Sequence, residues 1–269
     1  MGGLRYVYAV CRPFGAALQA QLTGVAGAPP KLLAHHGLVA VVSTVPEADF
    51  AEEALRDRLE DLDWLTVTAR AHQAVIDALT AVTTPLPLRL ATVFRDDSGV
   101  RVMMEEREDD FRSALDRLEG RVEWGVKVYL EKETSETEVA GTGSPAASTP
   151  ADAPATTGRD YLRQRRRRAR TNEDRWRNAE VFADQLHRTL SGHAEDSRLH
   201  PPQNSELSGA AGLNVLNAAY LVPRADSEQF VELVDRTKDE ASGLRVELTG
   251  PWAVYSFAES ISGTAGEDA

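Results

Sequence analysis

The sequence predicts an α+β fold in two domains joined by a flexible linker. Segments with helical spacing of apolar residues are interleaved with segments that alternate as strands do, and 269 residues exceed the usual size of one domain. Residues 132–157 contain no aromatic residue and one β-branched aliphatic residue, Val139. Such a segment buries too little surface to offset its ordering entropy. We therefore expect an N-terminal mixed α+β domain over 1–131, a C-terminal domain over 158–260, and a disordered tail at 261–269.

The stretch from Asp61 to Phe94 predicts the centre of the first domain. Its apolar stripe recurs at spacings of four, three, four and three residues, in Leu65, Ala69, His72, Ile76 and Leu79. Pro85 and Pro87 end this helix, because proline lacks an amide donor and disfavours helix in the residue before it. Leu88 to Phe94 then predicts a short buried strand.

The remaining elements of the first half follow from local signals. Alternation predicts a strand at Leu4–Val10, and a hairpin is expected at His36-Gly37. Thr44, with Glu47 three residues later, predicts a helix start. The further predictions are a turn at Asp96–Gly99, a helix over Val102–Leu118 that ends at Gly120, and a closing strand over Arg121–Leu130.

The second half predicts a ferredoxin-like domain with a long basic helix. From Asp160 onward, Leu162, Ala169, Trp176, Ala183 and Leu190 fall every seven residues. The expected order is then a strand within His193–Pro202, a central strand at Leu213–Val222, a helix after Asp226, and a strand at Leu244–Leu248. Gly250-Pro251-Trp252 is expected to turn the chain, with Ala253–Phe257 returning as an edge segment.

Charge and composition narrow the class of protein. The formal net charge is −12, yet Arg159 to Arg177 holds nine arginines against three acids, a local charge of +6. The single cysteine, Cys11, fits a reducing cytoplasm. No run of about 18 apolar residues predicts a membrane span, and no signal peptide is evident at the N-terminus.

No catalytic, cofactor-binding or metal-binding residue is expected. Neighbours in a strand point to opposite faces, so His35 and His36 are not expected to form a ligand pair. His72 lies on an apolar stripe and is expected to be a hydrogen-bonded core residue rather than a ligand. The other histidines lack zinc-site spacings, and neither Gly-x-Ser-x-Gly nor Gly-x-Gly-x-x-Gly occurs. A hydrolase with an unrecognised carboxylate site is a further alternative, and it would need a deep pocket that holds two carboxylates.

The arginine run Arg163–Arg170 leaves three interpretations open. It is a solvated helix face, a surface for a protein partner, or a nucleic-acid contact, since phosphates favour clustered guanidinium groups. The acidic chain and the absence of aromatic residues alternating with these arginines weigh against nucleic acid.

Several motifs, in order along both halves, resemble the gas vesicle protein F/L family. They are Trp64-Leu65 with ARAH (69–72), PLRLATVF (87–94), EWGVKV (123–128), GRDYL (158–162) followed by arginines, AYLV (219–222) and TGPW (249–252). Relatives usually place prolines after the tryptophan, where this chain has Ala253-Val254.

The resemblance implies a non-enzymatic accessory or minor structural protein of gas vesicle assembly. Its implied partners are the small hydrophobic shell protein, whose aggregation it would limit during vesicle nucleation and growth, and other gas vesicle accessory proteins. It would act in the cytoplasm during assembly and at the gas vesicle, without cofactor, nucleic acid or lipid membrane. A nucleic-acid-associated regulator that uses Arg163–Arg170 is the alternative. The candidate partner-binding residues are Arg165, Arg166, Arg167, Arg168 and Trp252.

Overall fold

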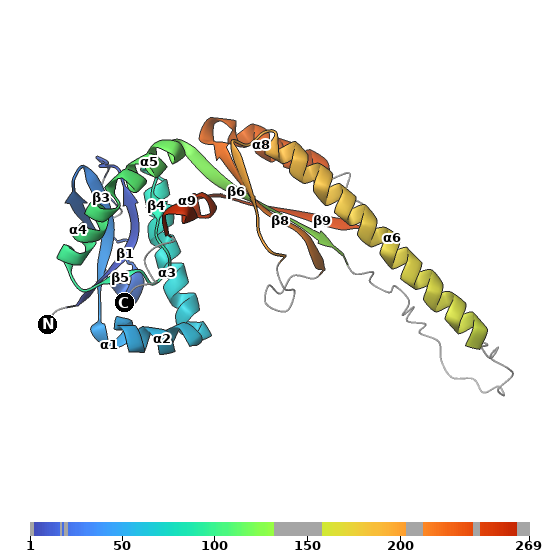
Figure 1. The fold of residues 1–269 in the computed structure, drawn as a ribbon, viewed down its shortest axis with the longest axis horizontal. Helices are drawn as coiled ribbons and strands as arrows, with labels where there is room; N and C mark the ends of the chain where they lie inside the picture. The colour runs from blue at the N-terminus through green and yellow to red at the C-terminus, as the bar shows by residue number, and fades with distance from the viewer. Residues whose placement is uncertain are drawn as a thin grey trace, which may run out of the picture.

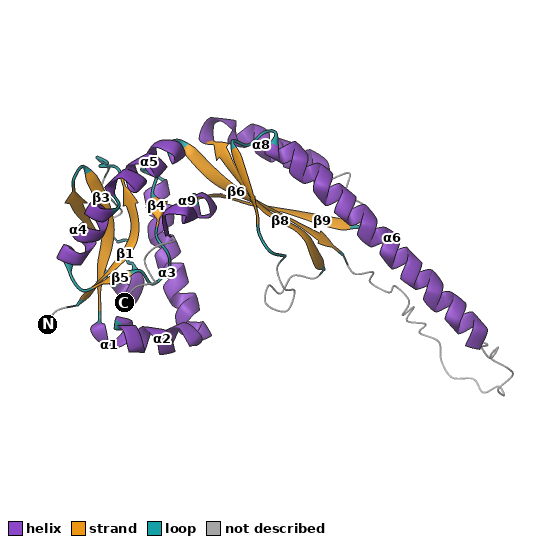
Figure 2. Ribbon diagram, viewed as in Figure 1, coloured by secondary structure: helices purple, strands orange, loops and turns teal. Residues whose placement is uncertain are grey.

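The structure is a computed structural model in which two antiparallel sheets are each covered by helices (Figures 1 and 2). It describes residues 3–16, 18, 21–131, 158–202, 212–238 and 243–262. The predicted linker at 132–157 and the last seven residues of the predicted tail lie outside these ranges. The predicted α+β class is confirmed.

The first sheet is built around β1, whose residues from Tyr6 to Cys11 are fully buried. The strand order is β2-β3-β1-β4, and β5 pairs with β1 as well. The strands are β1 (Leu4–Cys11), β2 (Lys31–His35), β3 (Leu38–Val45), β4 (Leu86–Pro87) and β5 (Val93–Phe94). The predicted hairpin is confirmed, because His35 pairs with Leu38 across His36-Gly37.

The helices of the first half pack on both sides of this sheet (Figure 1). They are η1 (Val25–Gly27), α1 (Glu47–Phe50), α2 (Glu52–Glu60), α3 (Leu62–Thr80), α4 (Asp97–Glu106) and α5 (Glu108–Leu118). In α3, His72, Ile76 and Leu79 are buried, which confirms most of the predicted stripe. The helix begins where the Asp61 side chain accepts hydrogen bonds from the amides of Asp63 and Trp64.

The predicted helix start is confirmed at Glu47, although Thr44 lies in β3 and Pro46 is the residue that precedes α1. Two other local predictions for this half are wrong. The segment Asp96–Gly99 is a helix start, because the Asp96 carboxylate accepts from two amides of α4. Leu88–Phe94 is not one strand: within it only Val93–Phe94 is a strand, since Ala91 has a φ of +64° and breaks the extended backbone.

The second sheet has the strand order β7-β8-β6-β9. Its strands are β6 (Arg121–Leu130), β7 (Asp196–Leu199), β8 (Leu213–Pro223) and β9 (Leu244–Trp252). Its helical elements are α6 (Gly158–Ser191), η2 (Arg224–Asp226) and α8 (Ser227–Lys238). Leu186 and Leu190 of α6 and Phe230 of α8 share a buried core with Trp124 of β6 and Tyr220 of β8. The predicted strands β7 and β8 are confirmed, with β8 in the interior of the sheet.

Strand β6 belongs to the second sheet, although the predicted boundary at residue 131 assigns it to the first domain. It pairs with β8 along its whole length, from Arg121 opposite Pro223 to Leu130 opposite Leu213. Its other edge pairs with β9. The limits of the two domains stay a prediction.

The end of the chain differs from its prediction. Strand β9 continues through Gly250 and Pro251 to Trp252, so no turn forms there. The expected edge segment is replaced by α9 (Tyr255–Ser262), which also contains the first residues of the predicted tail. The backbone amide of Ser256 donates to Oε2 of Glu123 at 2.8 Å, and its hydroxyl donates to Oε1 at 2.7 Å. A carboxylate at a helix N-terminus is favourable, which explains the helix.

Helix α9 joins the two halves through a common core. Phe257 and Val254 are buried with Val10 of β1 and Leu115 of α5, and Leu221 of β8 belongs to the same cluster. Figure 1 shows α9 beside β4 and α5, at the junction between the sheets. The C-terminal helix therefore completes the core of the first sheet.

Replacing Phe257 with alanine is expected to destabilise the protein by about 3–5 kcal/mol, because its side chain is fully buried and the cavity would not refill. Urea unfolding followed by circular dichroism would measure the change. Val181→Ala, at a half-exposed position of α6, is the control and should shift stability by less than about 0.5 kcal/mol. Equal stability of Phe257→Ala and the wild type would contradict the shared core.

Candidate partner-binding surface and polar clusters

The two halves of α6 have different surroundings. Ala179, Ala183, Leu186 and Leu190 in the second half are buried against the second sheet. The first half extends past the end of that sheet (Figure 1). In this projecting half, Arg165, Arg166 and Arg170 are exposed. The side chains of Arg167 and Arg168 lie outside the described residues.

Trp252 lies at the other end of the second sheet from these arginines. It pairs with Glu123 near the start of β6 and is 40% exposed. At the far end of β6, Nη2 of Arg175 donates to the carbonyl oxygen of Glu131 at 2.9 Å. Arg165 is ten residues before Arg175, or about 15 Å further along the helix. The candidate residues therefore form two separate surfaces and not one site.

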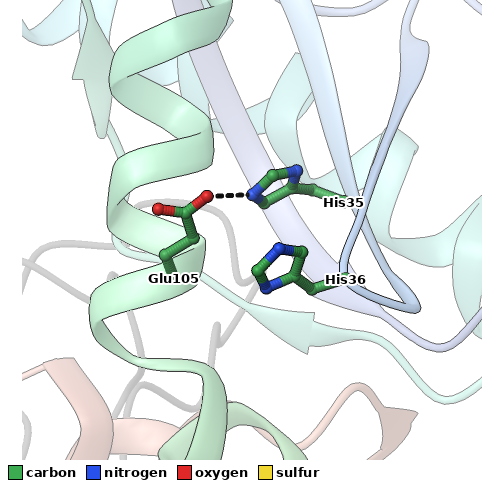
Figure 3. A group of neighbouring side chains, drawn as sticks. All are labelled: His35, His36 and Glu105. Carbon is green, nitrogen blue, oxygen red and sulfur yellow. Dashed lines mark hydrogen bonds and ion pairs between the residues drawn. The ribbon is translucent and has the colours of Figure 1, made fainter.

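His35 and His36 lie side by side, contrary to the prediction that they point apart. Their rings stack with centroids 4.3 Å apart and an angle of 14° between their planes (Figure 3). The alternation of a strand does not apply, because His36 has a φ of +47° and belongs to the turn after β2. Nε2 of His35 is 2.6 Å from Oε1 of Glu105, at the end of α4.

A second carboxylate holds His36 from the start of α5. Nδ1 of His36 is 2.9 Å from Oε2 of Glu108, while Nε and Nη2 of Arg112 donate to Oε1 of Glu108. The hydrogen bonds from His36 and Arg112 lower the pKa of the Glu108 carboxyl. Nη2 of Arg112 also donates to the carbonyl oxygen of His36 at 2.6 Å. The contacts of His36 with Glu108 and Arg112 connect the β2–β3 turn to the start of α5, next to the end of α4.

His72 is a buried, hydrogen-bonded core residue, as predicted. Its Nδ1 is 2.9 Å from the hydroxyl of Tyr6, which in turn accepts from the amide of Ala91 at 3.1 Å. Burial lowers the pKa of His72 to about 4, so the ring is neutral at neutral pH. Burial also raises the pKa of the Cys11 thiol to about 12, which disfavours the thiolate needed in a nucleophile.

A cavity of about 610 Å³ lies at the end of α3, between residues of both halves. Arg12, Arg224 and Glu119 contribute its charged groups. Among the described residues that line it, Glu119 is the one acid, and a hydrolase of the carboxylate type would need two.

Comparison with known proteins identifies the class of this chain. The family model described as "Gas vesicle synthesis protein GvpL/GvpF" matches residues 4–259, so the chain belongs to that family. Family membership supports a role in gas vesicle formation and an association with gas vesicles. No helix among the described residues is long and apolar enough to cross a membrane.

The relatives that this chain resembles include proteins named gas vesicle protein L and proteins named gas vesicle protein F. The chain is 55% identical to gas vesicle protein L of a Streptomyces species, over 98% of this chain and 95% of the relative. It is 27% identical to gas vesicle protein F of the same species, over 94% and 99%. The crystal structures of GvpF from Anabaena sp. and from Microcystis aeruginosa share its fold. The Anabaena structure has a TM-score of 0.64 at 16% identity, and the match covers 96% of this chain and 96% of that one. The Microcystis structure has a TM-score of 0.64 at 18% identity, and the match covers 96% of this chain and 99% of that one.

Acid should destabilise the protein through His72. Its folded-state pKa of about 4 lies below the ordinary 6.5, so the unfolded chain binds a proton first as the pH falls. The neutral His72 ring therefore contributes fully to the free energy of unfolding above pH 6.5, and this contribution is lost as the pH falls toward 4. At pH 5 the loss is about 2 kcal/mol. Urea unfolding of wild type and His72→Phe at pH 7.5 and 5.0 measures this loss. Between the two pH values, the free energy of unfolding should fall by about 2 kcal/mol less in the variant than in wild type. His193→Ala, at an exposed histidine, is the control and should behave as wild type; an equal loss in His72→Phe would refute the assignment.

Proposed function

We propose that this chain binds the small hydrophobic shell protein of gas vesicles, limits its aggregation, and helps to deliver it to a growing vesicle. The observation that carries the proposal is the projecting half of α6, which presents exposed arginines from a chain with a net charge of −12. A protein that works by contact needs such an accessible surface. Family membership supports the vesicle as the setting.

The physical demand on such a partner is twofold. A shell subunit exposes a large apolar surface before it assembles, and such surfaces associate unless they are covered. A strongly acidic chain that covers part of that surface keeps the complex dispersed by charge repulsion. The arginines supply attraction to an acidic partner surface, and Trp252 supplies an apolar contact at a second point. Arginine and tryptophan are the residue types that most often dominate interface energies.

We also propose that β6 and the elements from α6 to β9 form a ferredoxin-like unit. The order of elements, β6-α6-β7-β8-α8-β9, and the antiparallel strand order β7-β8-β6-β9 support this assignment. In this arrangement α6 is one of two helices that cover a face of the sheet, so its second half anchors the projecting half.

Replacing Arg165, Arg166, Arg167 and Arg168 together with glutamine should weaken capture of the co-expressed shell protein. The loss of four ion pairs of about 0.4 kcal/mol each would give roughly a tenfold higher Kd at low salt. The difference should shrink as salt rises, because exposed charges are screened. Pulldown with each partner tagged in turn, at 50 and 500 mM NaCl, measures it.

The matched control replaces four exposed arginines elsewhere, Arg56, Arg70, Arg95 and Arg236, with glutamine. It changes the net charge equally and should bind as wild type does. Equal binding of both quadruple variants at low salt would remove the arginines from the interface. Failure of the wild type to retain the shell protein in either tag orientation would overturn the proposal.

Trp252→Ala should also lower shell-protein capture, independently of salt, because an apolar contact is not screened. The control is Leu199→Ala, which removes another exposed apolar side chain from the edge strand β7. Unchanged capture by Trp252→Ala would restrict the interface to α6.

Retardation of DNA or RNA by the wild type at physiological salt, abolished in the α6 variant, would favour the alternative function of a nucleic-acid-associated regulator.

A further inference from the structure

We propose that His35, His36 and Glu105 bind a divalent transition-metal ion with the ligand preference of zinc. Each of the three side chains can offer one ligand atom, and these atoms all lie within 4.8 Å of one another. Two imidazoles and one carboxylate are a common set of protein ligands for Zn²⁺. Figure 3 shows the His35 ring directed from the β2–β3 turn at Glu105 of α4, with the His36 ring stacked beside it.

The hairpin turn brings the imidazoles together. His35 is the last residue of β2, and His36 and Gly37 form a two-residue loop with φ values of +47° and +72°. Positive φ at both loop residues is the geometry of a tight hairpin, and it suits glycine better than histidine. His36 therefore occupies a position where a non-glycine residue is disfavoured, with its ring stacked on that of His35.

Glu108 sets the orientation of the His36 ring. An ionised carboxylate only accepts hydrogen bonds, so Nδ1 of His36 carries the proton that points at Oε2 of Glu108. In the neutral ring this leaves the lone pair on Nε2, the atom available to a metal. Arg112 fixes Glu108 through two hydrogen bonds to Oε1. A carboxylate that orients a ligating histidine is the usual support of a metal site.

The ligand chemistry favours zinc over magnesium or calcium. Imidazole nitrogen suits Zn²⁺, Cu²⁺ and Ni²⁺, whereas Mg²⁺ and Ca²⁺ take oxygen ligands. Metal–ligand distances of about 2.0–2.2 Å place tetrahedral ligands roughly 3.3 Å apart. Nε2 of His35 and Oε1 of Glu105, now 2.6 Å apart, would separate slightly around the ion, which displaces the proton between them. The two stacked rings would also turn relative to each other, because an imidazole binds a metal in its own ring plane. Water would take the fourth position.

A bound ion would connect the first hairpin to α4. His35 and Glu105 are 70 residues apart in the chain, so the metal would link two distant segments of the first sheet and its helical cover. Because only the folded chain holds these ligands together, the ion should stabilise the native state.

The test is calorimetric titration of ZnCl₂ into the untagged full chain, with thermal unfolding at 0 and 100 µM ZnCl₂. Wild type should bind one equivalent and unfold at a higher temperature with zinc. His36→Asn keeps a residue that tolerates positive φ, and Glu105→Gln keeps the shape of the side chain. Each should bind zinc at least tenfold more weakly and show a smaller zinc-dependent rise in Tm.

His193→Asn, at an exposed histidine of the second half, is the matched control and should bind as wild type does. MgCl₂ should neither bind nor raise the Tm. Absence of zinc binding by wild type, or equal affinity of wild type and His36→Asn, would overturn the proposal. The unfolding temperatures without zinc show whether each variant still folds.

Discussion

The arrangement of the molecule depends on one buried carboxylate. Glu123 lies on β6, the strand that enters the second sheet from the first half, and it holds the start of α9 through the amide and hydroxyl of Ser256. Nε2 of His200 contacts the same hydroxyl at 3.1 Å. A buried carboxylate is tolerated only with such partners, and losing them leaves an uncompensated charge. Because Glu123 positions α9, Phe257 reaches the core of the first sheet.

Elements with a long, regular pattern could be predicted from the sequence, and those set by distant contacts could not. The stripe of α3 repeats over four turns, and β8 is an eleven-residue strand that is mostly apolar on both faces, so both could be predicted. Ala253–Phe257 is short and apolar, which is equally consistent with a strand or a helix. Its helix depends on Glu123, which is 133 residues away from Ser256 in the sequence. No local pattern contains that information.

The polar clusters also divide into features that the local sequence predicts and features that depend on distant contacts. The arginine run is visible as a reversal of local charge, and its exposure at Arg165 and Arg166 follows from its composition. The prediction that His35 and His36 point apart is wrong because the alternation of side chains along a strand does not extend to a residue in the turn. The predicted His36-Gly37 hairpin contained the signal, since a two-residue loop of type I′ has positive φ at both positions, as this one does. The contributions of Glu105 and Glu108 depend on how α4 and α5 pack and could not be read from spacing.

The projecting half of α6 has an energetic reason to meet a partner. Like charges three or four residues apart destabilise a helix by about 0.2–0.5 kcal/mol per pair, and Arg166 and Arg170 are one such pair. The second half offsets this repulsion, because Ala183, Leu186 and Leu190 are buried and hold the helix axis in place. The arginines are thus presented on a helix whose second half is anchored in the core. An acidic partner surface that docks on this half of α6 would relieve the repulsion between the arginines and form ion pairs with them. Both the attraction between the two proteins and the stability of the helix would then favour the complex.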